Sequence, residues 1–578
     1  MAVQRIARAA GIIMLGSVLS RVLGLGREVT ISHLFGGGPL VDAFTAASHI
    51  STIIYDLLIS GMVSAALVPV LSEYTTLERR AELGRILGII MTGALAVLLV
   101  GVAVLEIFAE PLVQFIAADA APATQALAVG MTQIVLPGVV FMGVSAVLMS
   151  ALYALHRYSF PSFAMSSLNV AIIVSALGLS WWLGVESLAV GMVLGAVLMV
   201  AIQWPGLRDV PIRLSLDFRH PAVRRILTLY APIALSLVIS QAALLIDRRW
   251  AFETGEGSVA AMRFSTTLIQ FGLGLVGAAI SLAALPSLSQ HFARGDEPAY
   301  RRTLGTGLRM VTVLVLPAAA GLFFLAAPIV TLFFEGGAFN EGDKWRTVLA
   351  LLCYVPGLPG AALNQVLIFG FYSRKNTVIP VAVGIGGVGV YVVTALLLKE
   401  PLGMAGLVLA NSAQLTFNAL VTGVLLWRAL GGLHGEGVGR TALKATLAAG
   451  LMGVVSFAAW AGLAALLPAP GNRLTEALAL VIPGGLGVLA YGGALYFLRV
   501  QELTLVLGMV VRRLPLKRHG RRPAPALAAR PAGAQEDVVI DDEMAALGTE
   551  NPAGTPAPHL VSLDLAGPEP DPVAQRKN

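Results

Sequence analysis

The first two strongly apolar stretches of the chain carry charged residues whose types and spacing could bind an anion. Arg21 lies in the middle of the apolar run 16–24, and Arg27 and Glu28 follow shortly after it. In a helix, Arg21 and Arg27 are about 120° apart around the axis and share one broad face. The planar arginine fork makes bidentate, charge-assisted hydrogen bonds that suit pyrophosphate. We therefore predict a cationic cavity for an anionic substrate.

A purely structural role is the alternative for these arginines. Glu28 or Asp42 could neutralise them at short range, or their long side chains could reach a membrane surface. Charges inside a membrane span are costly and rarely accidental, which favours a functional role most strongly for the central Arg21.

Further polar residues occur at four other positions. Asp42 and His49 stand seven residues apart, on one helix face. His49 could act as a proton switch, although a lone histidine is more often a hydrogen-bonded polar group. Asp247 is a candidate ion-coupling residue in a charged segment that could equally form a structural salt bridge. Arg263 lies about one turn into the next apolar stretch and is a candidate cavity residue.

Several classes of function lack their sequence signatures. We find no Gly-rich phosphate loop and no His-Glu-x-x-His zinc motif. Cys353 is the single cysteine, which excludes an intrachain disulfide and a thiolate metal cluster. No loop is long enough to hold a nucleotide-binding domain. We expect a non-enzymatic transporter without a cofactor or bound metal, driven by membrane potential or by a Na⁺ or H⁺ gradient.

Composition identifies the elements that must position these residues. Of the 578 residues, 57% are apolar and 12% are charged, whereas soluble proteins are nearer one quarter charged. Fourteen apolar stretches are each long enough to cross a bilayer, and helices are expected because open sheets leave backbone groups unpaired in hydrocarbon. The stretches are 8–33, 41–72, 84–108, 124–154, 160–183, 187–205, 225–248, 259–290, 304–334, 346–372, 377–398, 402–428, 441–468 and 475–499.

The distribution of basic residues predicts the orientation. Nineteen Lys and Arg residues fall in the segments on the N-terminal side, before the tail, and six fall on the opposite side. The positive-inside rule therefore places both termini in the cytoplasm. Residues 512–522 form a basic cluster that is either a further inside signal or a contact with anionic headgroups. The composition of 523–578 predicts disorder.

An internal repeat predicts two halves that run the same way through the membrane. Ser64–Ser72 recurs as Ser281–Ser289, an offset of 217, and Pro137-Gly138 recurs as Pro356-Gly357, an offset of 219. Each offset spans six helices, and parallel repeats are a transporter architecture with the substrate site between the halves. We predict six-helix lobes at 1–222 and 223–430, two extra helices at 431–500, and a cytoplasmic tail at 501–578.

The same segments resemble the MurJ (MviN) family of lipid II flippases, in the MOP exporter superfamily. The resemblance covers most of residues 8–430. It is carried by segments 17–28, 34–36, 42–44, 68–74, 154–158, 247–248, 285–289, 334–339 and 363–365.

The resemblance implies a V-shaped, two-lobed bundle whose central cavity alternates its access, with helices 13 and 14 forming a groove for a polyprenyl tail. It places Arg21, Arg27 and Ser17 in the substrate site, and we count His49 and Arg263 with them as substrate-binding candidates. It puts Glu28 at the family's gate aspartate and Asp42 at a second acidic position.

Two departures from the family pattern stand out. His49 replaces a usual arginine, and the usual cavity arginine of helix eight aligns with Thr267. Arg263, one turn earlier on the same face, is the candidate replacement.

We expect a flippase for lipid II in the bacterial inner membrane, with membrane lipids and cell-wall synthesis proteins as partners and no nucleic acid. The alternatives are a flippase for another polyprenyl-pyrophosphate oligosaccharide and a non-transporting scaffold. A drug/cation antiporter would have carboxylates in the cavity in place of arginines.

Overall fold

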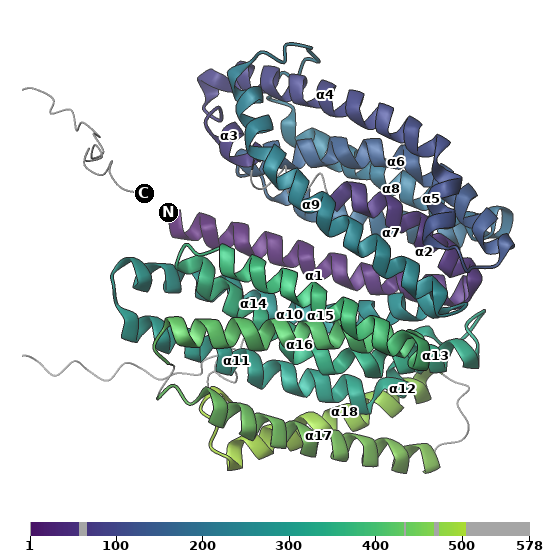
Figure 1. Ribbon diagram of the computed structural model, residues 1–578, viewed down its shortest axis with the longest axis vertical. Helices are drawn as coiled ribbons and strands as arrows, with labels where there is room; N and C mark the ends of the chain where they lie inside the picture. The colour runs from purple at the N-terminus through teal and green to yellow at the C-terminus, as the bar shows by residue number, and fades with distance from the viewer. Residues whose placement is uncertain (1, 57–65, 433–434, 467–472, 504–578) are drawn as a thin grey trace, which may run out of the picture. The chain divides into compact units, whose positions relative to one another are not determined.

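A computed structural model describes residues 2–56, 66–432, 435–466 and 473–503. The regular secondary structure of this part of the chain is helical, and an isolated bridge between Gly336 and Phe339 is its only strand-like pairing. The predicted all-helical class is therefore confirmed (Figure 1). The basic cluster 512–522 and the tail 523–578 lie outside the described residues.

The first half of the chain contains eight described α-helices. Two of them are short: α3, which follows the gap at 57–65, and α5, which continues from α4 after a break at Phe108. The helices are α1 (Ala2–Phe35), α2 (Pro39–Asp56), α3 (Val68–Ser72), α4 (Arg80–Ile107), α5 (Ala109–Ile116), α6 (Pro122–Ala154), α7 (Ser159–Leu183) and α8 (Glu186–Gln203).

The rest of the described chain contains ten α-helices. They are α9 (Pro221–Glu253), α10 (Ser258–Ala293), α11 (Glu297–Phe324), α12 (Ala326–Phe334), α13 (Glu341–Tyr354), α14 (Leu358–Ser373), α15 (Val378–Leu402), α16 (Met404–Ala429), α17 (Val438–Leu466) and α18 (Arg473–Phe497). Two predicted stretches are each divided into two helices, 304–334 at Leu325 and 346–372 at the 3-10 turn Val355–Gly357.

Ten helical segments in the described ranges are long and apolar enough to cross a membrane. α1, α9 and α10 add helices of 34, 33 and 36 residues that coincide with further predicted stretches. The chain is a multi-pass membrane protein, and the exact count of fourteen stays a prediction.

The two halves repeat the same neighbour relations. α7 packs on α8 and α6 on α8, just as α15 packs on α16 and α14 on α16. α2 and α4 both contact α6, and their counterparts α10 and α11 both contact α14. α17 and α18 form a hairpin against α11 and α12 (Figure 1). The parallel repeat is thus visible in the packing, while the exact lobe boundaries stay predictions.

The turns between helices repeat as well. Gly184 ends α7 with φ +57° and Gly403 ends α15 with φ +56°, an offset of 403 − 184 = 219. His156 and Lys375 follow α6 and α14 with φ +58° and +59°, again an offset of 375 − 156 = 219. His156 and Lys375 let the next backbone amide reach a free carbonyl of the last helical turn, as left-handed residues at helix ends commonly do: Arg157 donates to Leu152 and Asn376 donates to Phe371. These turns extend the repeat to positions that the sequence comparison did not match.

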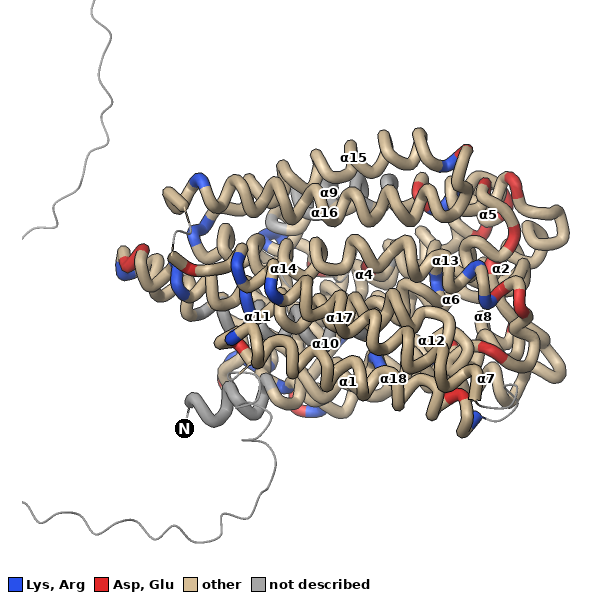
Figure 2. Tube along the Cα trace, turned by 90° about the horizontal axis from the view of Figure 1, so that it is seen from below, with Lys and Arg blue, Asp and Glu red and all other residues tan. Residues whose placement is uncertain are grey.

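The two ends of the helical bundle differ in charge. Figure 2 shows Lys and Arg gathered at the end where α1 begins, and more Asp and Glu at the opposite end. We call the first the basic end; it holds the turns at 155–158, 204–220 and 374–377. Ion pairs brace it, among them Arg80 and Arg157 with Asp209 and Arg374 with Glu297.

Candidate functional site

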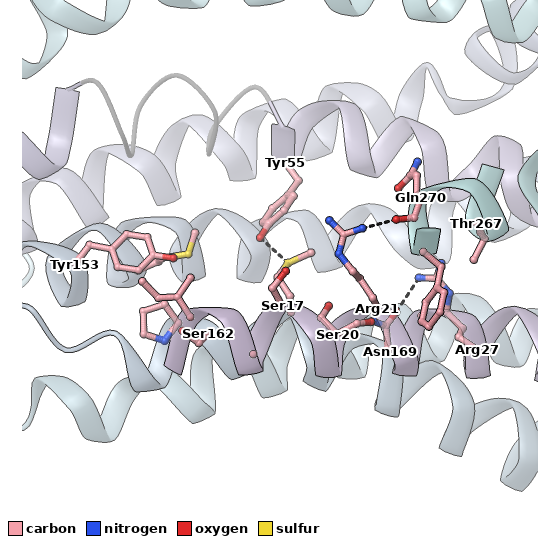
Figure 3. Close-up of a pocket in the computed structure, with 17 residues that line it drawn as sticks. Ser17, Ser20, Arg21, Arg27, Tyr55, Tyr153, Ser162, Asn169, Thr267 and Gln270 are labelled. Carbon is pink, nitrogen blue, oxygen red and sulfur yellow. Dashed lines mark hydrogen bonds between the residues drawn. The ribbon is translucent and has the colours of Figure 1, made fainter. Parts of the chain in front are cut away.

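A cavity of about 710 Å³ runs along α1 between α2, α6, α7 and α10. Figure 3 shows the polar side chains that line it. Its lining residues are Ile13, Gly16, Ser17, Ser20, Arg21, Gly24, Arg27, Tyr55, Met149, Tyr153, Pro161, Ser162, Met165, Asn169, Thr267, Gln270 and Phe271. Tyr153 and Pro161 belong to the last turn of α6 and the first turn of α7, so the cavity extends from Arg27 towards the basic end.

Arg21 projects from the middle of α1 into this cavity (Figure 3). One of its guanidinium nitrogens, Nη1, donates a hydrogen bond to the backbone carbonyl of Gln270 on α10. No ion pair joins Arg21 to a carboxylate within the described ranges. A guanidinium has five N–H donors, and the only hydrogen bond of Arg21 within the described ranges is the one from Nη1, so other donors of this cavity-lining residue can bind an anion.

Glu28 joins α1 to α10 at the far end of the cavity. Its carboxylate accepts from Arg263 Nε at 2.8 Å and Nη2 at 3.0 Å, which is a bidentate pair. The same carboxylate accepts from Arg27 Nη2 at 2.5 Å. The side chain of Glu28 is fully buried, and those of Arg27 and Arg263 are 23% and 15% exposed. A buried carboxylate of this kind is stable only while its partners hold it.

Arg27 is oriented by a second partner, Asn169 on α7. The Asn169 side-chain oxygen accepts from Arg27 Nη1 at 3.0 Å, and its amide donates to the Ser20 carbonyl at 3.1 Å. Asn169 therefore links the Arg27 guanidinium to the backbone of α1 beside Arg21. With Arg21, Arg27 and Arg263 against Glu28, the site carries a net charge of 3 − 1 = +2. A substrate with at least two negative charges would neutralise it.

Beyond Glu28, backbone and side-chain contacts join the two halves at the end opposite the basic end. Asp42 on α2 accepts from the backbone amides of Gly257 at 2.6 Å and Ala260 at 2.8 Å. Asp343 on α13 accepts from the amide of Gly37 at 3.0 Å. We call this set of contacts between residues 33–42, 257–260 and 338–343 the closed end.

Glycines permit the close approach of the backbones at the closed end. The Ala338 amide donates to the His33 carbonyl at 2.9 Å, and the adjacent Gly337 has φ +61°. A Cβ at Gly337 would overlap that His33 carbonyl oxygen. Gly36 has φ +76°, and a Cβ there would lie 2.7 Å from the Ala338 carbonyl oxygen. Any larger residue at Gly337 or Gly36 would hold the two halves apart.

The structure brings some predicted site residues together and separates others. Ser17, Arg21 and Arg27 line the cavity, whereas Arg263 lies behind its wall and pairs with Glu28. His49 is not a lining residue; its Nε2 has no hydrogen-bond partner in the described chain.

Asp42 does not line the cavity, and its carboxylate accepts the backbone amides of Gly257 and Ala260 at the start of α10. Asp247 accepts from the Tyr391 hydroxyl on α15 and does not line the cavity. In the described ranges no group of three His, Cys, Asp or Glu side chains could hold a metal ion.

Sequence reasoning did not single out Asn169, Gln270 or Asp343 as site residues. Asn169 has a usable signal, because it is a lone amide inside the apolar run of α7. Gln270 contributes a backbone carbonyl, which no residue pattern reveals. Asp343 occupies the position of an ordinary capping residue in the sequence, and in the structure it also completes a capping box with Asn340.

Comparison with known proteins places the chain among transporters. Residues 31–467 match the family model described as "Lipid II flippase MurJ". The lipid II flippase MurJ of Burkholderia cenocepacia is 32% identical over 419 residues, which are 70% of this chain and 80% of that protein.

Two solved structures share the fold. A structure of lipid II flippase MurJ in an inward closed conformation superposes with a TM-score of 0.70 at 21% identity, covering 87% of this chain and 99% of that one. An inward-facing multidrug resistance MATE family transporter of the MOP superfamily gives 0.62 at 14% identity, covering 72% and 95%.

Proposed function

The chain belongs to the lipid II flippase MurJ family, and from this we propose that it moves lipid II from the cytoplasmic to the outer leaflet of the bacterial inner membrane. The basic end then faces the cytoplasm with both termini, in accord with the positive-inside rule. The closed end faces outward. The observation that carries the proposal is Arg21, whose guanidinium faces the cavity with donors to spare.

In the proposed first step, the pyrophosphate of the lipid enters from the basic end. Arg21 and Arg27 lie six residues apart on α1, about 9 Å along the helix axis, so they can contact one extended anionic head group together. The bidentate geometry of arginine and the net +2 charge of the site favour a pyrophosphate over a neutral solute.

The second step is the exchange of access between the two ends. The closed end must release the bonds of Asp42 to α10, of Asp343 to Gly37 and of Ala338 to His33. An anion at Arg27 competes with Glu28 for the same guanidinium, because Glu28 already occupies Arg27 Nε and Nη2. Substrate binding thereby weakens the ion pairs of Glu28 that join α1 to α10, and this favours opening of the closed end.

We infer that membrane potential or a Na⁺ or H⁺ gradient drives the cycle. Moving one elementary charge through 100 mV supplies about 2.3 kcal/mol, enough to bias such an equilibrium. Asp247 is our candidate coupling carboxylate, because it lies at the contact of α9 with Tyr391 on α15, outside the substrate cavity. Partners in cell-wall synthesis remain part of the proposal.

A second candidate substrate is a different polyprenyl-pyrophosphate oligosaccharide. The observation that favours it is Thr267, which lines the cavity at the position where the family resemblance implies an arginine. A threonine there removes one cationic contact and leaves space for a different sugar.

The test is rescue of a bacterial strain depleted of its own lipid II flippase. The parent chain should restore growth, and Arg21→Ala should not, at equal membrane abundance. Arg85→Ala is the matched control, because Arg85 is 60% exposed and pairs with Asp217 outside the cavity. Outer-leaflet lipid II, measured with a membrane-impermeant reagent, should follow growth. Failure of an abundant parent chain to rescue would argue for the second substrate.

A further inference from the structure

Arg473, the first residue of α18, contacts α1 at the closed end and the neighbouring helix α12. Its Nη2 contacts Nε2 of His33 on α1, and its Nη1 lies 3.3 Å from the backbone carbonyl of Leu332 on α12. The α17–α18 hairpin lies outside the six-helix repeat, and α1 belongs to the first half. Arg473 thus links the hairpin to both halves of the molecule at one point.

The hydrogen bonds of His33 define the polarity of its contact with Arg473. His33 Nδ1 lies 2.8 Å from the carbonyl oxygen of Val29, which can only accept, so Nδ1 carries the proton. The unprotonated Nε2 is then an acceptor and receives an N–H from the arginine. Gly336, with φ +122°, leaves room for this contact, since a Cβ there would lie 3.2 Å from His33 Nε2 and 3.4 Å from Arg473 Nη2.

The rest of the hairpin is attached to the second half. Arg309 on α11 pairs with Glu502, which follows α18, and with Glu436, which precedes α17, at 3.5 Å. The Tyr491 hydroxyl on α18 donates to the carbonyl of Val313 on α11 at 2.7 Å. Glu502 and Tyr491 are both buried. The hairpin therefore moves with α11 and the second half. The contact of Arg473 with His33 connects this hairpin to the first half.

We propose that Arg473 is a positioning residue for transport, which couples the α17–α18 hairpin to the closed end by holding α1 and α12 together through His33 and Leu332. Opening of the closed end breaks the His33 contact and leaves the Leu332 contact intact. The inference rests on the proposed alternating access. The α17–α18 hairpin then takes part directly in the change of access, because a shift of α18 alters the contact of Arg473 with His33 on α1.

Crosslinking tests which of the two contacts must break. In a Cys353→Ser background, which removes the single native thiol, one variant carries His33→Cys with Arg473→Cys and the control carries Leu332→Cys with Arg473→Cys. Both receive the same reducible bifunctional thiol reagent, chosen to span the side chains replaced. The first crosslink should stop flipping until a reductant is added. The second should leave flipping at its value before crosslinking.

Three outcomes would overturn the proposal: no crosslink between positions 33 and 473, continued flipping with that crosslink formed, or an equal loss of flipping in the control. Failure of the proposed function is distinguishable, because it shows as no flipping by the Cys353→Ser chain in which His33 and Arg473 are unchanged.

A second measurement needs no substrate. In the Cys353→Ser background and in vesicles without lipid II, a Ser20→Cys reporter in the cavity is labelled by an impermeant thiol reagent added from the side of the closed end. Arg473→Ala should raise the labelling rate. His33→Gln, which keeps an acceptor, should raise it less than His33→Leu. An unchanged rate in Arg473→Ala would refute the coupling.

Discussion

Asp42 on α2 caps helix α10 from across the molecule: its carboxylate accepts the backbone amide of Gly257 at 2.6 Å, although the residues are 215 positions apart. Gly257 is the N-cap of α10 and has φ +76°, and the next bond goes to the amide of Ala260 at 2.8 Å. The side chain that ordinarily caps a helix is thus supplied by the other half. Helix capping and closure of the molecule become one interaction.

Asp42→Asn should therefore weaken the closed end. The amide keeps one acceptor but loses the charge that interacts with the positive end of the α10 dipole, and caps of this kind contribute about 1 kcal/mol. Labelling of the Ser20→Cys reporter from the closed-end side should accelerate several-fold, and Asp42→Ala should exceed Asp42→Asn. Glu341→Gln is the control, because Glu341 is 72% exposed at the same end. Equal labelling in all variants would contradict the capping role.

Glu28→Gln should destabilise the fold and impair transport together. The substitution leaves Arg27 and Arg263 facing each other without their shared carboxylate, and breaking a buried pair costs about 3–5 kcal/mol. The thermal unfolding midpoint in detergent should fall clearly. The double variant Glu28→Gln with Arg263→Gln should lose less stability than the sum of the single variants, because it also removes the unpaired charge. Strict additivity would show that the pair is not coupled.

Gly337→Ala should hold the closed end open. Alanine at φ +61° costs roughly 1–2 kcal/mol from backbone strain alone, and its Cβ also overlaps the His33 carbonyl oxygen. Gly295→Ala is the matched control, because Gly295 has φ +69° in the left-handed turn after α10, with nothing within 4 Å of a Cβ. Backbone strain should lower the stability of both variants by a similar amount, but only Gly337→Ala should raise the labelling rate of the reporter. If the two variants were labelled at similar rates, backbone strain and not overlap with the His33 carbonyl would be the cause of the faster labelling.

Acid should weaken the brace at the basic end. Arg157 donates to both oxygens of Asp209, at 2.5 and 2.8 Å, and this hydrogen bonding holds the pKa of Asp209 below its usual range. A lowered folded-state pKa adds stability above the ordinary aspartate pKa of about 3.9, and this stability is lost as the pH falls through the folded value. Since Asp209 is 44% exposed, we expect only a few tenths of a kcal/mol.

The measurement compares unfolding midpoints of the parent and Asp209→Asn across pH. The difference should be present at neutral pH and should vanish in strong acid. Asp119→Asn, at an exposed site, is the control for removing a surface carboxylate. A difference between parent and Asp209→Asn that persists at the lowest pH would exclude the titration of Asp209 as its cause.

The sequence by itself determined the membrane helices, their repeat and the arginines of α1. Apolar length specifies a spanning helix, and the offset of 219 between Pro137 and Pro356 recurs in the structure at Gly184 and Gly403. Arg21 and Arg27 were identifiable because a charged residue in an apolar span stands out in the sequence, whichever helices that span packs against. These are local properties, and local residue patterns encode them.

Only the tertiary structure decided which groups pair. Periodicity along a helix does not say which helix faces it, so nothing in the sequence joined Glu28 to Arg263, which is 235 positions away. The same holds for Asp42 with Gly257 and for Arg473 with His33. Backbone partners are invisible in residue identity, because every residue has a carbonyl. Long-range packing of the two halves sets these contacts, and it places Arg263 with Glu28 behind the cavity wall.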